Sequence, residues 1–298
     1  MRSQPSTRRG VPARRVATAV LAVLALLLVD ALAHRPAPAA AHPPSDVLPA
    51  AVQGYDGAGL PGVVAVVVAT QHQRVDELTP RAAEARAERL AAAWADNGWA
   101  AARRFPTASL VKLFVAEDVL RRVREGQVRL RPGDRDLLRR MITASDDPAA
   151  SALWVRYRGE RMVRAVARRY DLTGTAPPAV RGQWGSTTTT ARDLARFLAL
   201  LPVVAHPDDA ATLLGWMRET TRTAADGFDQ RFGLFGGGAA VKQGWMCCLG
   251  GRRHVHSVGV VDGTVVVLLA EVPDGVGYDA VRRALTSAAD RVPASPRT

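Results

Sequence analysis

Hydrophobic positions divide the chain into strand-like segments near both ends and helix-like segments between them. Short β-branched or apolar runs bounded by glycine or proline are typical of buried strands. Asp262-Gly263 separates two of these runs and is a strong signal for a two-residue hairpin turn. The runs with strand character are residues 62–70, 99–104, 239–248, 254–261 and 264–272.

The central part of the chain contains only segments with helical periodicity. Thr190, followed three residues later by Asp193, is typical of a capping-box start for one of these helices. The expected helices are residues 80–94, 110–124, 134–144, 148–157, 160–170, 191–201, 208–221 and, near the end, 278–291.

This order of elements predicts an α/β (α+β) fold. Two early and three late strands favour one antiparallel five-stranded sheet assembled from both chain ends and flanked by helices. The helices between them form an inserted all-helical part. We therefore expect an α/β part at residues 50–106 and 236–298 and a helical part at 107–235.

Residues 1–41 have the pattern of an export signal. Arginines precede a 14-residue apolar run, Val16 to Val29, and three alanines at 39–41 offer a cleavage site. The run is short for a membrane span and Asp30 closes it, so cleavage is favoured over an uncleaved anchor. The sequence predicts a secreted or cell-envelope protein whose folded domain is residues 42–298.

Charge excludes one class of partner. Removal of residues 1–41 takes away six arginines and one aspartate, which reduces the net charge from +12 to +7. The remaining arginines are spread through Ala/Arg/Glu-rich helices and form no basic stripe with aromatic residues, so a nucleic-acid partner is not expected. We expect a monomer that needs no cofactor.

Lysine usage is the most informative feature of the composition. Of 40 lysines and arginines, only Lys112 and Lys242 are lysines. An ammonium group can lose its proton when it is buried, whereas a guanidinium cannot. Ser109 lies three residues before Lys112, a spacing that places both side chains on one helical face. The pair therefore predicts a serine nucleophile with a lysine base.

Two further pairs allow alternative interpretations. Cys247 and Cys248 are neighbours on an expected strand, so two buried small residues are favoured over a vicinal disulfide. His254 and His256 alternate on one strand face. A two-histidine metal site without another ligand is weak, and surface histidines without metal are favoured.

Three short motifs occur in the order found in penicillin-interacting serine enzymes. The third motif lies on an expected strand and includes Lys242, the second of the two lysines. The motifs read Ser109 to Lys112, Ser145-Asp146-Asp147, and Lys242-Gln243-Gly244. With the threonine run at 187–190, the chain resembles the class A β-lactamase and penicillin-binding serine hydrolase superfamily over essentially its whole mature length.

The resemblance implies a role for each motif. Ser109 would be acylated by a β-lactam or a cell-wall peptide amide, with Lys112 as its base. Ser145 would pass a proton to the leaving nitrogen, and Lys242 would hold Ser145 and attract a substrate carboxylate. The backbone N–H groups of Ser109 and Trp245 would form the oxyanion hole. Asp147, Gln243 and Gly244 would contribute to substrate binding.

Departures from the family pattern modify this expectation. Asp147 replaces asparagine and could raise the pKa of Lys112, while Gln243 replaces a hydroxyl residue that binds substrate carboxylates. The loop at residues 172–186 contains no acid to activate a deacylating water, and Glu160 and Asp171 are poor substitutes. The further candidates for lining a groove or meeting a substrate carboxylate are Trp184, Trp216, Trp245, Arg222, Arg252 and Arg253.

Three functional hypotheses follow. The first, which the sequence favours, is an exported serine hydrolase that forms an acyl-enzyme and deacylates slowly. The second is an efficient class A β-lactamase, against which the acid-free loop argues. The third is a non-catalytic envelope-binding member of the fold. Retention of Lys112 argues against it, because a binding module could accept arginine there.

Overall fold

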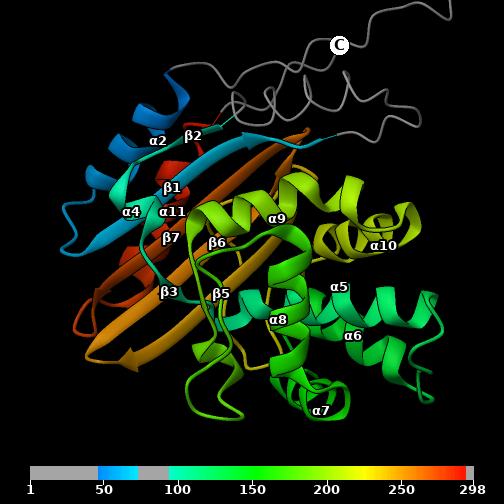
Figure 1. Ribbon diagram of the computed structural model, residues 1–298. Helices are drawn as coiled ribbons and strands as arrows, with labels where there is room; N and C mark the ends of the chain where they lie inside the picture. Colours follow the sequence, from blue (N-terminus) through cyan, green and yellow to red (C-terminus); the bar gives the residue numbers. More distant parts are fainter. Residues whose placement is uncertain (1–45, 73–93, 293–298) are drawn as a thin grey trace, which may run out of the picture. The chain divides into compact units, whose positions relative to one another are not determined.

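Five antiparallel strands form the central sheet of the computed structural model, which describes residues 46–72 and 94–292 (Figure 1). Their order across the sheet is β2-β1-β7-β6-β5. The strands are β1 (Val63–Thr70), β2 (Trp94–Asp96), β5 (Ala240–Leu249), β6 (Arg252–Val261) and β7 (Thr264–Pro273). The predicted α/β fold, with one sheet built from both chain ends, is confirmed.

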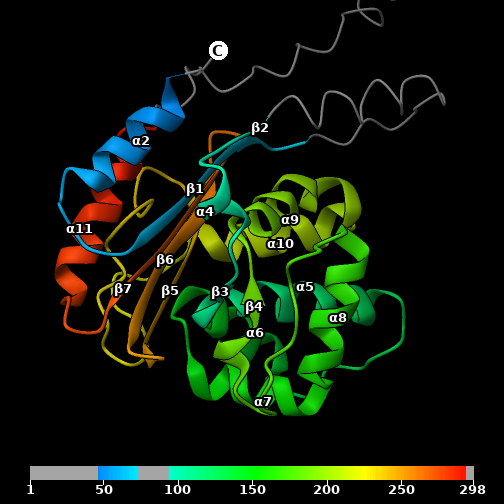
Figure 2. The same cartoon turned by 60° about the vertical axis from the view of Figure 1, so that its left-hand side comes forward.

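The two faces of the sheet are buried under different sets of helices. Along β1, Ala65 and Val67 face one hydrophobic core, whereas Val64 and Val66 face the other. This alternation follows from the two-residue period of a strand, and coverage of both faces explains why the run is apolar throughout. Helices α2 (Val47–Asp56) and α11 (Tyr278–Ala289) pack together on one face (Figure 2).

The helical part covers the opposite face of the sheet (Figure 2). Its central helix, α5 (Val111–Arg124), is almost fully buried along its first ten residues. Phe114 contacts Phe197 edge to face, with ring centroids 5.1 Å apart, and so joins two helices of this core. The other helices of this part are α6 (Asp134–Thr143), α7 (Asp147–Tyr157), α8 (Gly159–Tyr170), α9 (Ala191–Val204) and α10 (Pro207–Arg218). The short helix α4 (Trp99–Ala102) precedes them in the chain.

The second strand lies earlier in the chain than the sequence predicts. Residues 99–104 were expected to form it, but the strand is β2 at Trp94–Asp96, and Trp99–Ala102 is helix α4. The Asn97 side chain explains the change, because it donates to Val64 O and accepts from Val66 N at 2.8 and 3.0 Å. These bonds occupy the edge of β1 at which the expected strand would otherwise have paired.

Two expected segments lie wholly or mostly outside the described residues. The predicted signal at residues 1–41 is one. The other is the predicted helix at 80–94, of which only Trp94 is described, and Trp94 belongs to a strand. Conversely, α2 was not predicted. No helix among residues 46–72 and 94–292 is long and apolar enough to cross a membrane.

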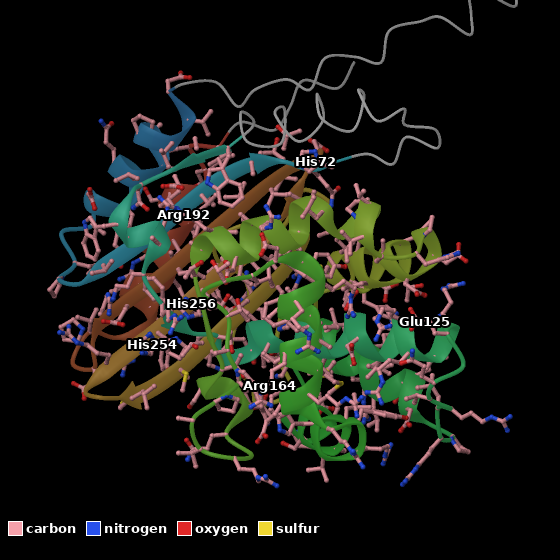
Figure 3. All side chains as sticks on the ribbon, viewed as in Figure 1. His72, Glu125, Arg164, Arg192, His254 and His256 are labelled. Carbon is pink, nitrogen blue, oxygen red and sulfur yellow. A yellow bond between two sulfur atoms is a disulfide. The ribbon has the colours of Figure 1, made fainter. Side chains whose placement is uncertain are left out.

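His254 and His256 are buried on β6 rather than exposed, contrary to expectation (Figure 3). Burial lowers the pKa of His254 to about 4 and that of His256 to about 3, so both rings are neutral at pH 7. The His256 ring Nε2 lies 3.0 Å from Pro106 O. In the described part of the chain, no cluster of three metal-ligating side chains includes them.

Candidate active site

A short 3-10 turn, η1 (Ala108–Leu110), presents Ser109 at the start of α5. Ala108 has a φ of 46°, an unusual conformation for a residue with a side chain. The Thr107 N–H donates to Thr187 O at 2.7 Å and holds the turn against the segment before α9. Backbone strain of this kind concentrates at functional sites, where the surrounding structure maintains it.

Lys112 lies one helical turn after the serine and is fully buried. Its Nζ donates to Ser109 Oγ at 2.9 Å, to Ser145 O at 2.7 Å and to Asp147 Oδ1 at 2.5 Å. Burial lowers the pKa of the Lys112 ammonium, while the Asp147 carboxylate opposes that shift. The net direction is downward, which favours release of a proton from this amine.

Ser145 follows α6 and lies between the two lysines. Its φ of 52° is also in the left-handed region. Ser145 Oγ accepts from Lys112 Nζ at 3.2 Å and from Lys242 Nζ at 2.9 Å. Because a hydroxyl has two acceptor positions, its own O–H remains available as a donor.

Lys242 is fully buried on β5, behind Ser145. Burial and the nearby charge of Lys112 lower its pKa well below the usual value. Its Nζ also donates to Gln243 O at 3.0 Å. Its position supports contact with Ser145, but its complete burial does not support the predicted direct attraction of a substrate carboxylate.

Gly244 lets strand β5 approach the Ser109 turn closely. A Cβ at this position would lie 3.1 Å from Thr107 O and 3.2 Å from Leu110 Cγ. The glycine therefore permits this close packing, and it is not among the residues that line the cavity in front of Ser109, contrary to its predicted role in substrate binding.

A cavity of about 500 Å³ opens in front of Ser109. The Trp184 ring centroid lies 4.9 Å from Lys112 Nζ, and its Nε1 donates to Ser151 Oγ at 3.1 Å. The loop that carries Trp184 thus forms one wall and β5 forms the other. The lining residues are Ala108, Ser109, Asp147, Gly182, Gln183, Trp184, Gly185, Ser186, Trp245, Met246, Cys247, Cys248 and Leu249.

Most of the predicted site residues fall into two groups, which share Ser109. Ser109, Asp147 and Trp245 line the cavity. Lys112, Ser145 and Lys242 form a hydrogen-bonded group with Ser109, which we call the lysine centre.

Gln243 lies apart from the cavity, contrary to its predicted role in substrate binding. Its side chain is buried, and its amide donates to Gln230 O and Phe232 O at 3.1 and 2.6 Å. The amide is therefore already occupied by backbone carbonyls.

Asp147 is the only acid among the described residues that line the cavity. Asp171 pairs with Arg196 at 3.3 Å, and Glu160 lines a different hollow with Arg164. The loop at 172–186 supplies Trp184 and several polar groups to the cavity wall but no carboxylate.

Cys247 and Cys248 form a disulfide and are both exposed on the cavity wall. The expectation of two buried small residues was wrong. Burial along β5 ends before these residues, because the last part of the strand extends beyond the helices. The alternation expected of a regular strand also fails here, because the pairing of β5 with β6 shifts in register between Met246 and Leu249.

Only some of the aromatic and arginine candidates line the cavity. Trp184 and Trp245 line the cavity, and Trp245 stacks on Phe228 with ring centroids 4.3 Å apart. Trp216 is buried in the helical core. The three arginine candidates are not among the described residues that line the cavity; they are Arg222, Arg252 and Arg253.

Some lining residues were missed by sequence reasoning. No motif singles out Gln183, Met246 or Leu249, which reach the cavity through the course of the loop and the end of β5. The only feature of the sequence that could have indicated these residues is that they follow a recognised motif or lie in the loop at 172–186.

Solved structures of β-lactamases share the fold. The β-lactamase of Sphaerobacter thermophilus matches with a TM-score of 0.58 and 17% identity over 82% of this chain and 95% of its own. The protein PBP-A matches with a TM-score of 0.57 and 19% identity over 84% of this chain and 96% of its own.

Sequence comparison gives a nearer relative. LppW of Mycobacterium tuberculosis, named as a candidate lipoprotein, is 42% identical over 166 residues, which are 52% of this chain and 51% of LppW. The match thus spans about half the length of this curated relative. A sequence profile described as the Beta-lactamase enzyme family matches residues 134–292, more than half of the chain. Together with the shared fold, this match shows that the chain belongs to the β-lactamase enzyme family.

Proposed function

We propose that this protein is an exported serine hydrolase that is acylated at Ser109 by β-lactams or cell-wall peptide amides and deacylates slowly. The observation that carries the proposal is the 2.9 Å contact between Lys112 Nζ and Ser109 Oγ inside a buried centre. A serine hydroxyl is a weak nucleophile at neutral pH and needs an adjacent base. A buried amine with a lowered pKa meets that need.

The proposed acylation begins with proton transfer. Neutral Lys112 accepts the Ser109 hydroxyl proton as Ser109 Oγ attacks the carbonyl carbon of the substrate. The backbone N–H groups of Ser109 and Trp245 are the proposed donors to the resulting oxyanion. Both residues line the same cavity, which supports this assignment.

The second half of acylation releases the substrate amine. The carbon–nitrogen bond breaks, and the Ser145 hydroxyl gives its proton to the leaving nitrogen. Protonated Lys112, 3.2 Å from Ser145 Oγ, replaces that proton. Lys242 holds Ser145 in place from the other side, which makes it a positioning residue. The site ends with acylated Ser109 and neutral Lys112.

Slow deacylation is proposed from the chemistry of the cavity wall. Hydrolysis of the ester requires a base for the attacking water. Asp147 is the only lining carboxylate in the described part of the chain, and it is paired with Lys112 at 2.5 Å. The described residues that line the cavity therefore offer no second carboxylate to act on a water in front of Ser109.

Export is proposed from the pattern of residues 1–41, and the named relative supports an envelope location through its name alone. A cell-envelope location would bring the cavity to cell-wall peptides.

The test is intact-mass analysis of the purified protein incubated with benzylpenicillin for minutes to hours. Ser109→Ala removes the proposed nucleophile. Ser186→Ala is a matched control, because it removes another hydroxyl from the same cavity. We expect a persistent adduct in the wild-type protein and in Ser186→Ala, and none in Ser109→Ala.

Other results would overturn parts of the proposal. Hydrolysed penicillin without an adduct would identify an efficient β-lactamase and refute slow deacylation. Intact penicillin without an adduct, together with no reaction of a D-alanyl thioester, would refute acylation. That outcome would favour the non-catalytic hypothesis, which the ion pair between Lys112 and Asp147 supports.

A further inference from the structure

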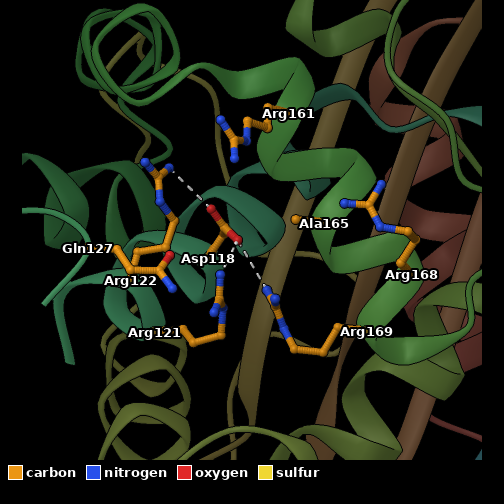
Figure 4. A pocket seen from close by; sticks show the side chains of 8 residues that line it. All are labelled: Asp118, Arg121, Arg122, Gln127, Arg161, Ala165, Arg168 and Arg169. Carbon is orange, nitrogen blue, oxygen red and sulfur yellow. Dashed lines mark hydrogen bonds and ion pairs between the residues drawn. The ribbon is translucent and has the colours of Figure 1, made fainter. Parts of the chain in front are cut away.

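A second hollow of about 430 Å³ lies between the end of α5 and the exposed face of α8 (Figure 4). It shares no lining residue with the Ser109 cavity. We call it the arginine hollow, because five of its eight lining residues are arginines. The lining residues are Asp118, Arg121, Arg122, Gln127, Arg161, Ala165, Arg168 and Arg169.

The floor of the arginine hollow is fixed by a buried carboxylate. Asp118 is 1% exposed and accepts from Arg121 and Arg122 at 3.4 Å and from Arg169 at 3.2 Å (Figure 4). Arg169 also donates twice to buried Glu117, at 3.1 and 2.6 Å. These bonds hold three guanidinium groups in place.

Two further guanidinium groups face the hollow without any such pairing. Arg161 and Arg168 are exposed on α8, seven residues apart, and have no side-chain hydrogen bond or ion pair with the described residues. That spacing corresponds to about two helical turns, which brings both side chains to one face of α8. Ala165 lies between them, and its short side chain leaves the space open.

Positive charge exceeds negative charge in the arginine hollow. Among the described residues, the acids that pair with any of its five arginines are Glu117 and Asp118 below and Glu125, which pairs with Arg121 at the rim. Arg121 Nε is in addition buried without a hydrogen-bond partner. The hollow therefore holds a surplus of about two positive charges and of unused N–H donors.

We propose that the arginine hollow binds a phosphate group. Guanidinium groups suit this ligand because their paired N–H donors match two phosphate oxygens at once, and they stay charged at every physiological pH. A phosphate monoester carries about the charge that the surplus would neutralise. A free phosphorylated molecule and a phospholipid headgroup share the paired phosphate oxygens, although the headgroup is a diester with one negative charge.

The test uses pyrophosphate as the probe and isothermal titration calorimetry on the full chain at 0.15 M salt. The variant Arg161→Gln/Arg168→Gln removes the two unpaired arginines. The matched control, Arg164→Gln/Arg181→Gln, removes the same charge from a neighbouring hollow, which Arg161 also lines. Arg164 lies on the same helix (Figure 3).

We expect the first variant to bind pyrophosphate at least tenfold more weakly than wild type, and the control to change by less than threefold. Penicillin labelling at Ser109, if present in wild type, and the circular dichroism spectrum should be unchanged in both variants. Absence of wild-type binding, or equal loss in both variants, would overturn the proposal. Because labelling is read separately, failure of one proposal leaves the other intact.

A second arm identifies the source of the phosphate. The same proteins are sedimented with phosphatidylglycerol vesicles and with phosphatidylcholine vesicles. Pyrophosphate binding together with phosphatidylglycerol vesicle binding, both dependent on Arg161 and Arg168, would assign the hollow to a lipid headgroup. Pyrophosphate binding without vesicle binding would assign it to a free phosphorylated molecule. Vesicle binding that is equal in wild type and the double variant, without pyrophosphate binding, would refute a phosphate site here.

Discussion

The lysine centre and the arginine hollow are both cationic, but they differ in burial and in the kind of cation. Lys112 and Lys242 are fully buried, and burial lowers the pKa of both amines. In the arginine hollow, Arg161 and Arg168 remain exposed and permanently charged.

The difference separates two uses of positive charge. An amine whose pKa is lowered can exchange a proton with Ser109 or Ser145, which are within 3.2 Å of Lys112. A guanidinium cannot exchange a proton but can hold an anion in a defined orientation. The structure therefore supports proton transfer at one site and anion binding at the other.

The largest expected effect comes from Lys112→Arg, which keeps the charge but removes the base. We expect the rate of acylation at Ser109 to fall by about 10²–10⁴-fold, the usual contribution of a general base. The measurement is the rate of adduct formation by mass spectrometry. Arg168→Lys, the reverse exchange in the arginine hollow, serves as the control and should leave that rate unchanged. An undiminished rate in folded Lys112→Arg would contradict the base assignment.

A smaller effect is expected from Asp147→Asn. The Asp147 carboxylate raises the pKa of Lys112, in opposition to burial. Its removal should lower that pKa further, so the neutral amine should form at lower pH. The acid limb of the pH–acylation profile should therefore move to lower pH. A limb that stays in place, or moves to higher pH, would show that another group controls the profile.

The last prediction compares how strongly salt concentration affects the two sites. Exposed charges are screened strongly as the Debye length falls, whereas buried groups are screened much less. Between about 0.05 and 0.5 M salt, pyrophosphate affinity should fall by about tenfold or more. Acylation by an uncharged thioester should change by less than about twofold. Equal salt dependence at both sites would remove the distinction drawn here.

The sequence by itself predicted the sheet, most helices and the residues that the structure brings together in the lysine centre. Strand runs at both chain ends, separated by helical periodicity, were sufficient to predict the five-stranded sheet, because burial of both faces leaves a clear apolar pattern. The rarity of lysine identified Lys112 and Lys242 before any contact was known. The predicted helix start at Thr190 is also confirmed, because Thr190 Oγ1 accepts a hydrogen bond from Asp193 N at 3.0 Å.

Tertiary structure decided which neighbouring residues face the cavity. Sequence grouped Gln243 with Lys242 in one motif, yet Gln243 bonds to the backbone carbonyls of Gln230 and Phe232. It also placed His254 and His256 at the surface, although the sheet buries them. Burial depends on which helix covers a strand, and local pattern contains no such information.

The arginine hollow shows the same limit most clearly. Its residues come from the end of α5 and from α8, which lie more than 30 residues apart in the chain. Each segment alone has the sequence pattern of an ordinary solvated helix. Packing of the two helices around Asp118 brings the five guanidinium groups together. The chemistry of each side chain is fixed by its sequence, but their surplus of charge exists only because tertiary contacts concentrate them in one place.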